Sequence, residues 1–222
     1  MNQFDIALYG HLTIDYIINN FKETTSLGAM ANVWHALTKI DPNIKLKINP
    51  SAIGEAIVII NEMSAQRVGR GNLNMRTIDP KIVDSQWHHI MYLNRLEDKS
   101  FLSNIKSGII SADTTAGDMD ILESLPYIDY LFVSDEDLSF DIKELANQVK
   151  GWVILHYPSG SYSTDGSKTI VKANNVRHNI NVLGAGDTFA ACFISSMLRN
   201  NDMDQALDYA HQNTIRILTD EI

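Results

Sequence analysis

Short runs of apolar and β-branched residues alternate along the chain with longer amphipathic stretches. The apolar runs are typical of buried strands, and the amphipathic stretches are typical of helices. The predicted strands are Phe4–Tyr9, Ala56–Ile60, His89–Leu93, Gly108–Ala112, Tyr130–Val133 and Val153–Leu155. The predicted helices between them are Ala29–Ile40, Lys99–Ile105, Gly117–Leu125 and Ile142–Val149. Strands that alternate with helices predict parallel β-α-β units and a layered α/β fold.

Two regions of the chain depart from this alternation. In the segment Ala56–Arg70 two strand-like runs lie close together, which predicts a hairpin rather than a crossover unit. The last third ends in two predicted helices, Ala185–Leu198 and Asp204–Leu218, and apolar residues recur every four positions along the first of them. Because no repeat, low-complexity tract or linker-like segment interrupts the pattern, we expect residues 1–222 to form a single domain.

Composition narrows the class of protein. The 222 residues include 18 Lys and Arg against 27 Asp and Glu, a formal net charge of −9, and 45% are hydrophobic. An acidic globular chain carries no general electrostatic signature for nucleic acid or for an anionic membrane surface. The longest clear apolar run, Ala56–Ile60, is far shorter than the roughly 20 residues that cross a bilayer. The single Cys192 cannot form an intramolecular disulfide, so we expect a cytoplasmic protein with neither nucleic acid nor membrane as a partner.

The most informative local feature is the turn Gly184-Ala185-Gly186-Asp187-Thr188-Phe189, directly before a predicted helix. Two glycines allow the backbone to turn tightly and to direct several N–H groups toward one point. The positive end of the helix dipole then makes a suitable site for an anion, above all a phosphate. Asp187 at this place is either a capping residue or a base that takes a proton from a hydroxyl attacking the bound phosphate.

Two familiar nucleotide motifs do not describe this turn. A dinucleotide-binding turn would carry a third glycine at the position of Phe189 and would follow the first strand. A P-loop would need Gly-x-x-x-x-Gly-Lys-Ser/Thr, which the sequence lacks. A Rossmann-type oxidoreductase is therefore kept only as an outside alternative.

The turn resembles the second half of Asp-Thr-x-Gly-Ala-Gly-Asp-x-Phe, the hallmark of the ribokinase-like (PfkB-type) carbohydrate kinases. Other segments follow in the order of that family. Ile6-Ala7-Leu8-Tyr9-Gly10 with Asp15 is similar to its opening strand and substrate-binding aspartate. Gly28 and Asn32 match the helix start at which a glycine and an asparagine face the sugar. The resemblance extends over nearly the whole chain.

This resemblance implies a three-layer α/β sandwich with a central, mostly parallel sheet. It also implies transfer of the γ-phosphoryl group from ATP, with Mg²⁺, to a hydroxyl of a sugar or sugar-like small molecule. Asp187 would be the general base, and Gly184, Ala185 and Gly186 would form the turn that stabilises the transferring group. The substrate-binding residues implied are Asp15, Gly28 and Asn32.

For the nucleotide side, the resemblance implies three binding residues and two metal-binding residues. Ser134 stands where the family has the asparagine of an Asn-x-x-Glu motif, Gly160 is the last glycine of its nucleotide loop, and Asn213 lies on the helix that borders the adenine. Glu136 and Asp137 would hold Mg²⁺, largely through water.

The sequence departs from the family at functional positions. The motif Ser134-x-x-Asp137 replaces Asn-x-x-Glu, and Gly160 alone remains of the nucleotide loop. Only the 12 residues 16–27 separate Asp15 from Gly28, so we expect the β-strand lid over the sugar to be reduced or absent. Two functions follow: an ATP-dependent kinase, or a catalytically impaired ligand-binding protein on the same fold. A homodimer stays open as its assembly.

Overall fold

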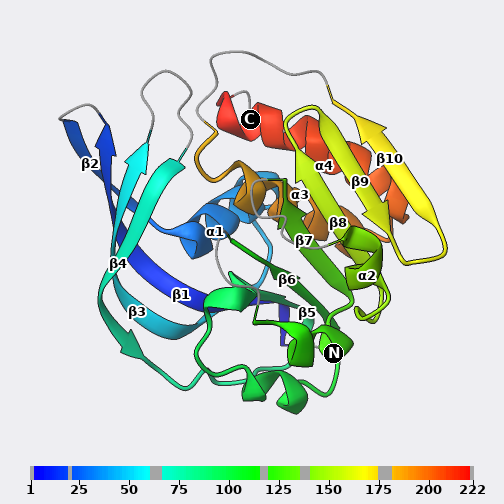
Figure 1. Ribbon diagram of the computed structural model, residues 1–222, viewed down its shortest axis with the longest axis horizontal. Helices are drawn as coiled ribbons and strands as arrows, with labels where there is room; N and C mark the ends of the chain where they lie inside the picture. Colours follow the sequence, from blue (N-terminus) through cyan, green and yellow to red (C-terminus); the bar gives the residue numbers. More distant parts are fainter. Residues whose placement is uncertain are drawn as a thin grey trace.

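One ten-stranded sheet runs through the molecule (Figure 1). The structure is a computed structural model, and it describes residues 3–19, 22–60, 67–115, 120–135, 141–174 and 182–220. The strands are β1 (Phe4–Asn19), β2 (Lys22–Leu27), β3 (Leu46–Ile60), β4 (Arg67–Thr77), β5 (Ser85–Ile90), β6 (Ile109–Asp113), β7 (Tyr130–Ser134), β8 (Trp152–Tyr157), β9 (Gly160–Thr164) and β10 (Thr169–Ala173). The helices are α1 (Ala29–Ile40), α2 (Ile142–Ala146), α3 (Ala185–Leu198) and α4 (Met203–Leu218), with 3₁₀ helices η1 (Leu93–Arg95), η2 (Ser100–Asn104) and η3 (Leu122–Tyr127).

The centre of the sheet is parallel. The strand order is β10-β9-β8-β7-β6-β5-β1-β3-β4, with β2 paired to β1. The six strands from β8 to β3 in this order run parallel to one another, and antiparallel β9, β10 and β4 complete the two edges. The prediction of a mostly parallel α/β sheet is confirmed. The carboxyl ends of the parallel strands meet at one edge, where such sheets bind their ligands.

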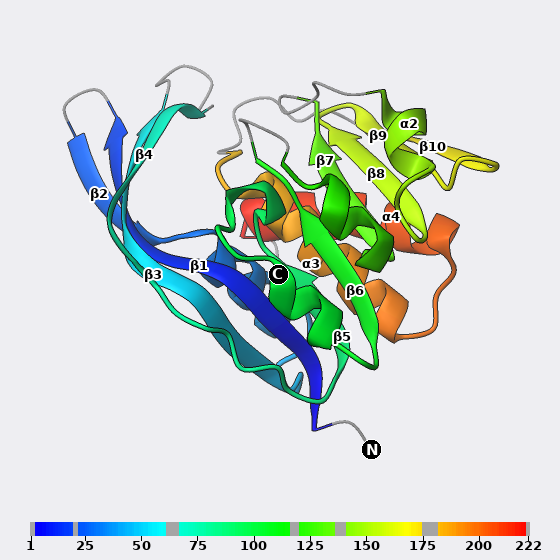
Figure 2. The same ribbon diagram turned by 60° about the horizontal axis from the view of Figure 1, so that its bottom comes forward.

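Helices cover both faces of the sheet and make three layers (Figure 2). Helices α1, α3 and α4 pack on one face, and α2 with the three 3₁₀ helices packs on the other. Along β1, Ile6 and Leu8 join the first core cluster, whereas Ala7 and Tyr9 join the second. Successive strand residues point to opposite faces, so a strand buried on both sides is apolar throughout. The predicted three-layer sandwich is confirmed, and no described helix combines the length and apolarity that a bilayer crossing needs.

The crossings on the second face are shorter than the sequence pattern predicts. Where helices are predicted at Lys99–Ile105 and Gly117–Leu125, the structure has only the 3₁₀ helices η2 and η3. Residues 116–119 lie outside the described part. Pro126 within η3 cannot donate the backbone hydrogen bond that an α-helix would need.

Beyond the core sheet, β1 and β3 continue and pair with β2 and β4 to form a four-stranded extension that projects from the body (Figures 1 and 2). This lid sheet comprises β2, residues 11–19 of β1, residues 52–60 of β3, and β4. Strand β2 pairs antiparallel with β1 from Ile14↔Leu27 to Asn19↔Lys22, and β4 pairs antiparallel with β3. The hairpin predicted for Ala56–Arg70 is confirmed, and the expectation of a reduced or absent lid is wrong.

The lid forms from few residues because two of its strands are prolongations of core strands. Strand β1 spans 16 residues and β3 spans 15, so each crosses the core and continues into the lid without a break. The segment between Asp15 and Gly28 then has to supply only the last four residues of β1 and the six residues of the returning strand β2. A hairpin connection needs as few as two to five residues.

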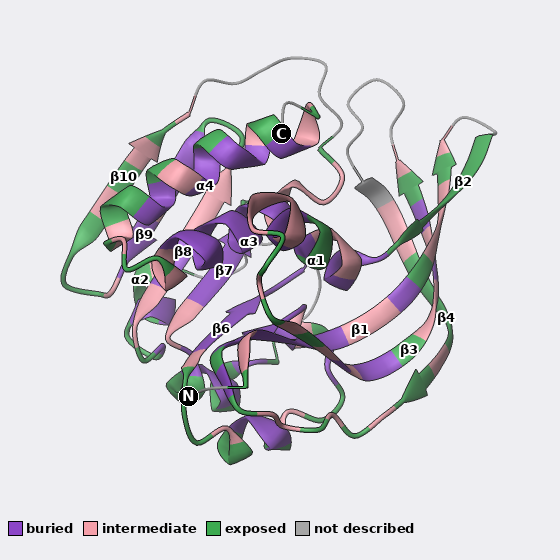
Figure 3. Cartoon of the chain, turned by 180° about the vertical axis from the view of Figure 1, so that it is seen from behind, coloured by how far each residue is buried: buried purple, intermediate pink, exposed green. Residues whose placement is uncertain are grey.

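The lid sheet has two unlike faces, because residues opposite each other in a sheet share a face. The cross-strand row Asp15, Ala56 and Asn72 belongs to the inner face, on which Ala56 is fully buried. The outer face carries exposed aliphatic side chains at positions 14, 18, 27, 53, 59 and 73. In Figure 3 these strands are mostly pink and green, whereas α3 and the core strands are largely purple.

Candidate active site

Helices α1 and α3 meet at one pair of polar side chains. The Asn32 amide Nδ2 donates a hydrogen bond of 2.8 Å to Oδ2 of Asp187, across 155 positions of sequence. Asp187 is 6% exposed and lies in the first turn of α3, while Asn32 is partly buried in the first turn of α1. The residue predicted as the base and a residue predicted to bind the substrate are therefore in direct contact.

Gly184 permits this contact. It caps α3 in the left-handed conformation, with φ 79°, and a Cβ atom there would lie 2.7 Å from Asn32 Nδ2. Any larger residue would be strained and would also displace Asn32. The Ala185 amide donates to the Val182 carbonyl at 3.0 Å, so it stabilises the turn itself. The amides of Gly186 and Asp187 lie in the first turn of α3. No preceding helical turn supplies a carbonyl to accept from them, so these amides form a site for an anion.

A third residue, Tyr92, contacts the other oxygen of the same carboxylate, and the sequence pattern did not identify it. Its hydroxyl donates to Oδ1 of Asp187 at 3.4 Å. Tyr92 has φ 52°, a left-handed conformation that is uncommon for a residue with a side chain. Its backbone amide donates to Oδ1 of Asp113, which is 6% exposed at the end of β6. Asp113 thus holds the backbone that directs the Tyr92 hydroxyl toward Asp187.

Asp113 is itself positioned by a buried polar chain. His89 Nε2 lies 3.5 Å from Oδ2 of Asp113, and His89 Nδ1 lies 2.8 Å from Oγ of Ser111. Ser111 Oγ accepts a hydrogen bond of 2.7 Å from Trp87 Nε1, so its own proton is directed to His89 Nδ1. This assignment leaves the ring proton of His89 on Nε2, facing the carboxylate.

Asp15 and Gly28 lie beside the start of α1, where the lid sheet joins the core. Oδ1 of Asp15 accepts from the Thr13 hydroxyl at 2.6 Å, and the Gly28 amide donates to the Thr13 carbonyl at 2.9 Å. A Cβ atom on Gly28 would lie 2.1 Å from Thr13 Oγ1 and 3.1 Å from Asp15 Oδ1. The structure therefore gathers the predicted substrate-binding residues Asp15, Gly28 and Asn32 around one helix start.

On the predicted nucleotide side, Ser134 ends β7 and pairs with His156 of β8. His156 Cε1 is 3.1 Å from the place a Cβ atom on Gly186 would occupy, so this strand edge adjoins the glycine turn. Burial, with a smaller contribution from the nearby His211, lowers the pKa of His156 to about 4. Both imidazoles contact the ring of Phe189, at centroid distances of 5.3 and 4.9 Å, and support the start of α3 as neutral rings.

Gly160 and Asn213 have contacts that serve the local fold. Gly160 begins β9 with φ 153°, and a Cβ atom there would lie 2.0 Å from the Lys172 carbonyl of β10. Asn213 is 6% exposed on α4, where its amide donates to the Tyr209 carbonyl at 3.0 Å and its oxygen accepts from Arg216 at 3.2 Å. Their predicted role in nucleotide binding stays a prediction.

The predicted metal residues Glu136 and Asp137 lie outside the described residues. Within the described part, no group of three or more His, Cys, Asp or Glu side chains is placed to hold one metal ion. Mg²⁺ in phosphoryl transfer keeps several waters and takes its other oxygen ligands from one or two carboxylates and from phosphates.

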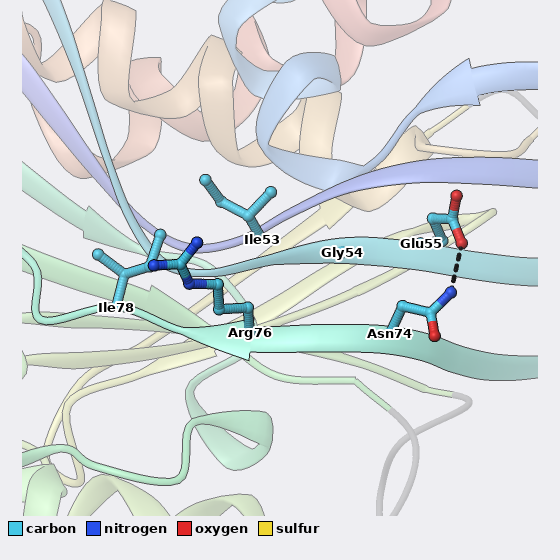
Figure 4. Close-up of a pocket in the computed structure, with 6 residues that line it drawn as sticks. All are labelled: Ile53, Gly54, Glu55, Asn74, Arg76 and Ile78. Carbon is cyan, nitrogen blue, oxygen red and sulfur yellow. Dashed lines mark hydrogen bonds between the residues drawn. The ribbon is translucent and has the colours of Figure 1, made fainter.

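A separate hollow of about 390 Å³ lies on the outer face of the lid sheet (Figure 4). Its lining residues are Ile53, Gly54, Glu55, Asn74, Arg76 and Ile78. Asn74 Nδ2 donates to Glu55 Oε2 at 2.9 Å across it. Because Asp15 points to the inner face, this hollow is distinct from the candidate active site.

Comparison with known proteins places these residues in context. The family model for pfkB family carbohydrate kinases matches residues 102–213, which are 112 of the 222 residues. The ATP-dependent ribose-1-phosphate kinase of Halopiger xanaduensis is 29% identical over 101 residues, which are 43% of this chain and 34% of that protein. The match thus spans about a third of the relative's length.

Solved structures share the fold over almost the whole chain. A probable sugar kinase from Rhizobium etli CFN 42 has a TM-score of 0.79 at 11% identity, and covers 99% of this chain and 94% of its own. Adenosine kinase from Sinorhizobium meliloti has a TM-score of 0.74 at 11% identity, with 98% and 94% covered. Ribokinase from Thermotoga maritima has a TM-score of 0.71 at 13% identity, with 95% and 90% covered. At these identities the likeness is one of fold.

Proposed function

The chain belongs to the pfkB family of carbohydrate kinases, and from this premise we propose that it transfers the γ-phosphoryl group of ATP to a hydroxyl of a sugar or sugar-like molecule. The observation that carries the proposal is the contact between Asn32 and Asp187, with Asp15 and Gly28 grouped around the same helix start. The name of the curated relative, an ATP-dependent ribose-1-phosphate kinase, supports ATP as the donor and a sugar-type acceptor.

In the proposed reaction, the acceptor binds between the inner face of the lid sheet and the start of α1. Asp15 accepts hydrogen bonds from hydroxyl groups of the acceptor, and Asn32 presents its carbonyl oxygen to them. Asp187 takes the proton of the attacking hydroxyl as that oxygen bonds to the γ-phosphorus, while the bond between the γ-phosphorus and the oxygen of the leaving ADP breaks. Because Asn32 and Tyr92 bond opposite oxygens of the carboxylate, they fix its orientation before the acceptor binds.

The phosphoryl group would lie over the N-terminus of α3. Its developing negative charge is stabilised by the amides of Gly186 and Asp187 and by the helix dipole. Mg²⁺ bound with ATP supplies charge neutralisation for the phosphates. The lid sheet above Asp15 excludes water from the acceptor, which favours transfer to the sugar over hydrolysis.

The catalytically impaired alternative rests on Ser134, which replaces the amide side chain of the family motif, and on Gly160, whose contacts are those of a hairpin. Calorimetric titration with ATP·Mg²⁺ separates the two functions. Binding at millimolar nucleotide or below, with ADP release in the presence of sugars, supports the kinase. Binding of sugars without any binding of ATP·Mg²⁺ would leave the impaired protein.

Substitution Asp187→Asn tests the base. We expect turnover to fall by about 10²- to 10⁴-fold while the affinity for ATP stays within a factor of about two. Asp84 is exposed, and its backbone carbonyl, not its side chain, accepts a hydrogen bond from the Phe4 amide. The control Asp84→Asn should therefore leave turnover and ATP affinity unchanged. Full activity in Asp187→Asn would eliminate Asp187 as the base.

The assembly that we propose with this function is a homodimer through the outer face of the lid sheet. Among the described residues, six of the eleven exposed large hydrophobic side chains lie on this face: Ile14, Ile18, Leu27, Ile53, Ile59 and Leu73. Several exposed aliphatic side chains gathered on one sheet face are typical of an interface rather than of free surface. A second copy is the partner because the same patch on both subunits is self-complementary about a two-fold axis.

A further inference from the structure

Arg70 of β4 lies on the inner face of the lid sheet, on the same side as Asp15. Its cross-strand row, Ile17, Val58 and Arg70, is next to the row that contains Asp15 on this face. The guanidinium Cζ is 5.3 Å from the centroid of the Tyr92 ring, within the range of a cation–π contact. Since the Tyr92 hydroxyl bonds Asp187, a single aromatic ring joins this cation to the candidate base.

The charge of Arg70 is incompletely satisfied by the protein. Its Nε is buried and has no hydrogen-bond partner among the described residues, and none of the ion pairs formed within them includes Arg70. A guanidinium stays charged at any physiological pH, and a buried donor without a partner lowers the stability of the protein. The Tyr92 ring compensates only through its face. An acceptor atom supplied by a ligand would complete the arrangement.

His11 shares the inner face with Arg70. Its pKa is lowered by burial and further by the positive charges of Arg70 and Arg95, whereas Glu97 acts in the opposite direction. Glu97 also accepts a hydrogen bond from the Thr77 hydroxyl at 3.1 Å. Two guanidinium groups and one carboxylate therefore lie near His11, although the chain as a whole carries a net charge of −9.

We propose that the acceptor carries an anionic group, a phosphomonoester or a carboxylate, and that Arg70 binds it while a hydroxyl of the same molecule faces Asp187. The inference rests on the proposed kinase function and names the substrate class of the same site. The planar fork of a guanidinium matches the oxygens of both anions, and the Tyr92 ring holds that fork in place. A neutral sugar leaves the guanidinium unpaired, so the site discriminates against it.

The test compares the wild type with Arg70→Gln and Arg70→Lys on three acceptor panels: neutral pentoses and hexoses, their monophosphates, and sugar acids. We expect the wild type to prefer one anionic panel, and Arg70→Gln to lower kcat/KM for that panel by about 10- to 100-fold, mainly through KM. The loss for neutral sugars should be smaller, because a neutral acceptor forms no ion pair with the guanidinium. Arg70→Lys keeps the charge without the fork and should recover part of the loss. Whether phosphates or sugar acids are preferred identifies the anion.

Arg76 provides a matched control. It lies on the same strand but lines the hollow on the outer face, so Arg76→Gln should leave acceptor preference unchanged. Calorimetric binding of the preferred anionic acceptor without nucleotide gives a readout independent of turnover. Its affinity should fall with added salt in the wild type and much less in Arg70→Gln.

The outcomes separate this inference from the kinase proposal. The anion site is overturned if the wild type phosphorylates neutral sugars as well as anionic ones and Arg70→Gln lowers kcat/KM for both equally or for neither. That result leaves the kinase proposal intact. If no acceptor is phosphorylated, the kinase proposal fails, and the calorimetric binding measurement alone tests the anion site. If the wild type binds a sugar phosphate or a sugar acid and Arg70→Gln does not, the anion site is supported. If the wild type binds neither, the anion site is overturned.

Discussion

The backbone amide of Tyr92 donates to the carboxylate of Asp113, and this bond holds Tyr92 in the left-handed conformation from which its hydroxyl bonds Asp187. Tyr92 contacts the candidate base at 3.4 Å, and Arg70 lies over its ring. Tyr92 therefore contributes both to the orientation of the base and to the position of Arg70, and the buried Asp113 at the end of β6 holds the Tyr92 backbone.

Removal of either side of this relationship should slow phosphoryl transfer by a similar factor. We expect Tyr92→Phe, which loses one hydrogen bond to Asp187, to lower kcat by about 5- to 10-fold. Asp113→Ala should have an effect of similar size, because the Tyr92 backbone loses its acceptor. Asp113→Asn keeps an oxygen for the amide and should retain most of the activity. Steady-state kinetics on the three variants measures these effects.

The double variant Tyr92→Phe/Asp113→Ala distinguishes positioning from a general loss of stability. If Asp113 acts through Tyr92, the double variant should be no slower than the slower single variant. Multiplicative effects on kcat would mean that Asp113 acts on the site by another route.

Gly184→Ala should destabilise the protein and disturb the site together. The left-handed φ of 79° and the approach of Asn32 Nδ2 to 2.7 Å leave no room for a methyl group, so we expect a loss of about 1–3 kcal/mol in the free energy of unfolding. Denaturant titration measures it. Gly71→Ala is the matched control, since nothing lies within 4 Å of a Cβ atom there, and its change should stay within about 0.5 kcal/mol. Equal effects of the two substitutions would contradict the assignment.

His156 should make stability depend on pH in the mildly acidic range. Its pKa is about 4 in the folded protein, below the ordinary histidine value of 6.5, so between these pH values the unfolded chain binds a proton that the folded protein does not. The free energy of unfolding should therefore fall as the pH drops from 6.5 toward 4, by up to about 1.4 kcal/mol per pH unit from this group. Below pH 4 both states are protonated and this contribution no longer changes.

Unfolding measured at several pH values in wild type and His156→Gln isolates the contribution of His156 to the free energy of unfolding, because the other titrating groups remain in both proteins. The variant should lose stability less steeply between pH 6.5 and 4. His35→Gln, at an exposed position on α1, should keep the wild-type slope. A slope that is the same in all three proteins would show that His156 is protonated in the folded state.

The proposed dimer should dissociate when a charge enters the apolar patch of the lid sheet. Ile59 is 44% exposed and pairs with Ile18 of the neighbouring strand on the outer face. We expect Ile59→Lys to be monomeric by light scattering at concentrations at which the wild type is dimeric. Val171 is 64% exposed on β10, far from this face in the strand order, so Val171→Lys should stay dimeric. A wild type that is monomeric at all concentrations would end the homodimer proposal.

The lid illustrates where prediction from sequence failed. The pattern of Phe4–Tyr9 predicts a strand but not its continuation to Asn19, because most residues in the lid half of β1 are only partly buried. In the lid, β1 pairs with residues of β3 that lie 41 positions away in the chain, and pairing over that range is set by which surfaces meet in the fold. The count of residues between Asp15 and Gly28 could not show that two core strands are long enough to form most of the lid.

The sequence by itself determined the layered α/β fold, the hairpin after Ala56 and the glycine turn before Asp187, because hydrophobic period and turn chemistry are local properties of neighbouring residues. Only the tertiary structure decided that Asn32, Tyr92 and Asp187 meet, that Asp113 bonds the Tyr92 backbone, and that Arg70 lies over the Tyr92 ring. These contacts join residues from different strands and helices. They exist because the parallel sheet brings the ends of its strands, and the lid above them, to one edge.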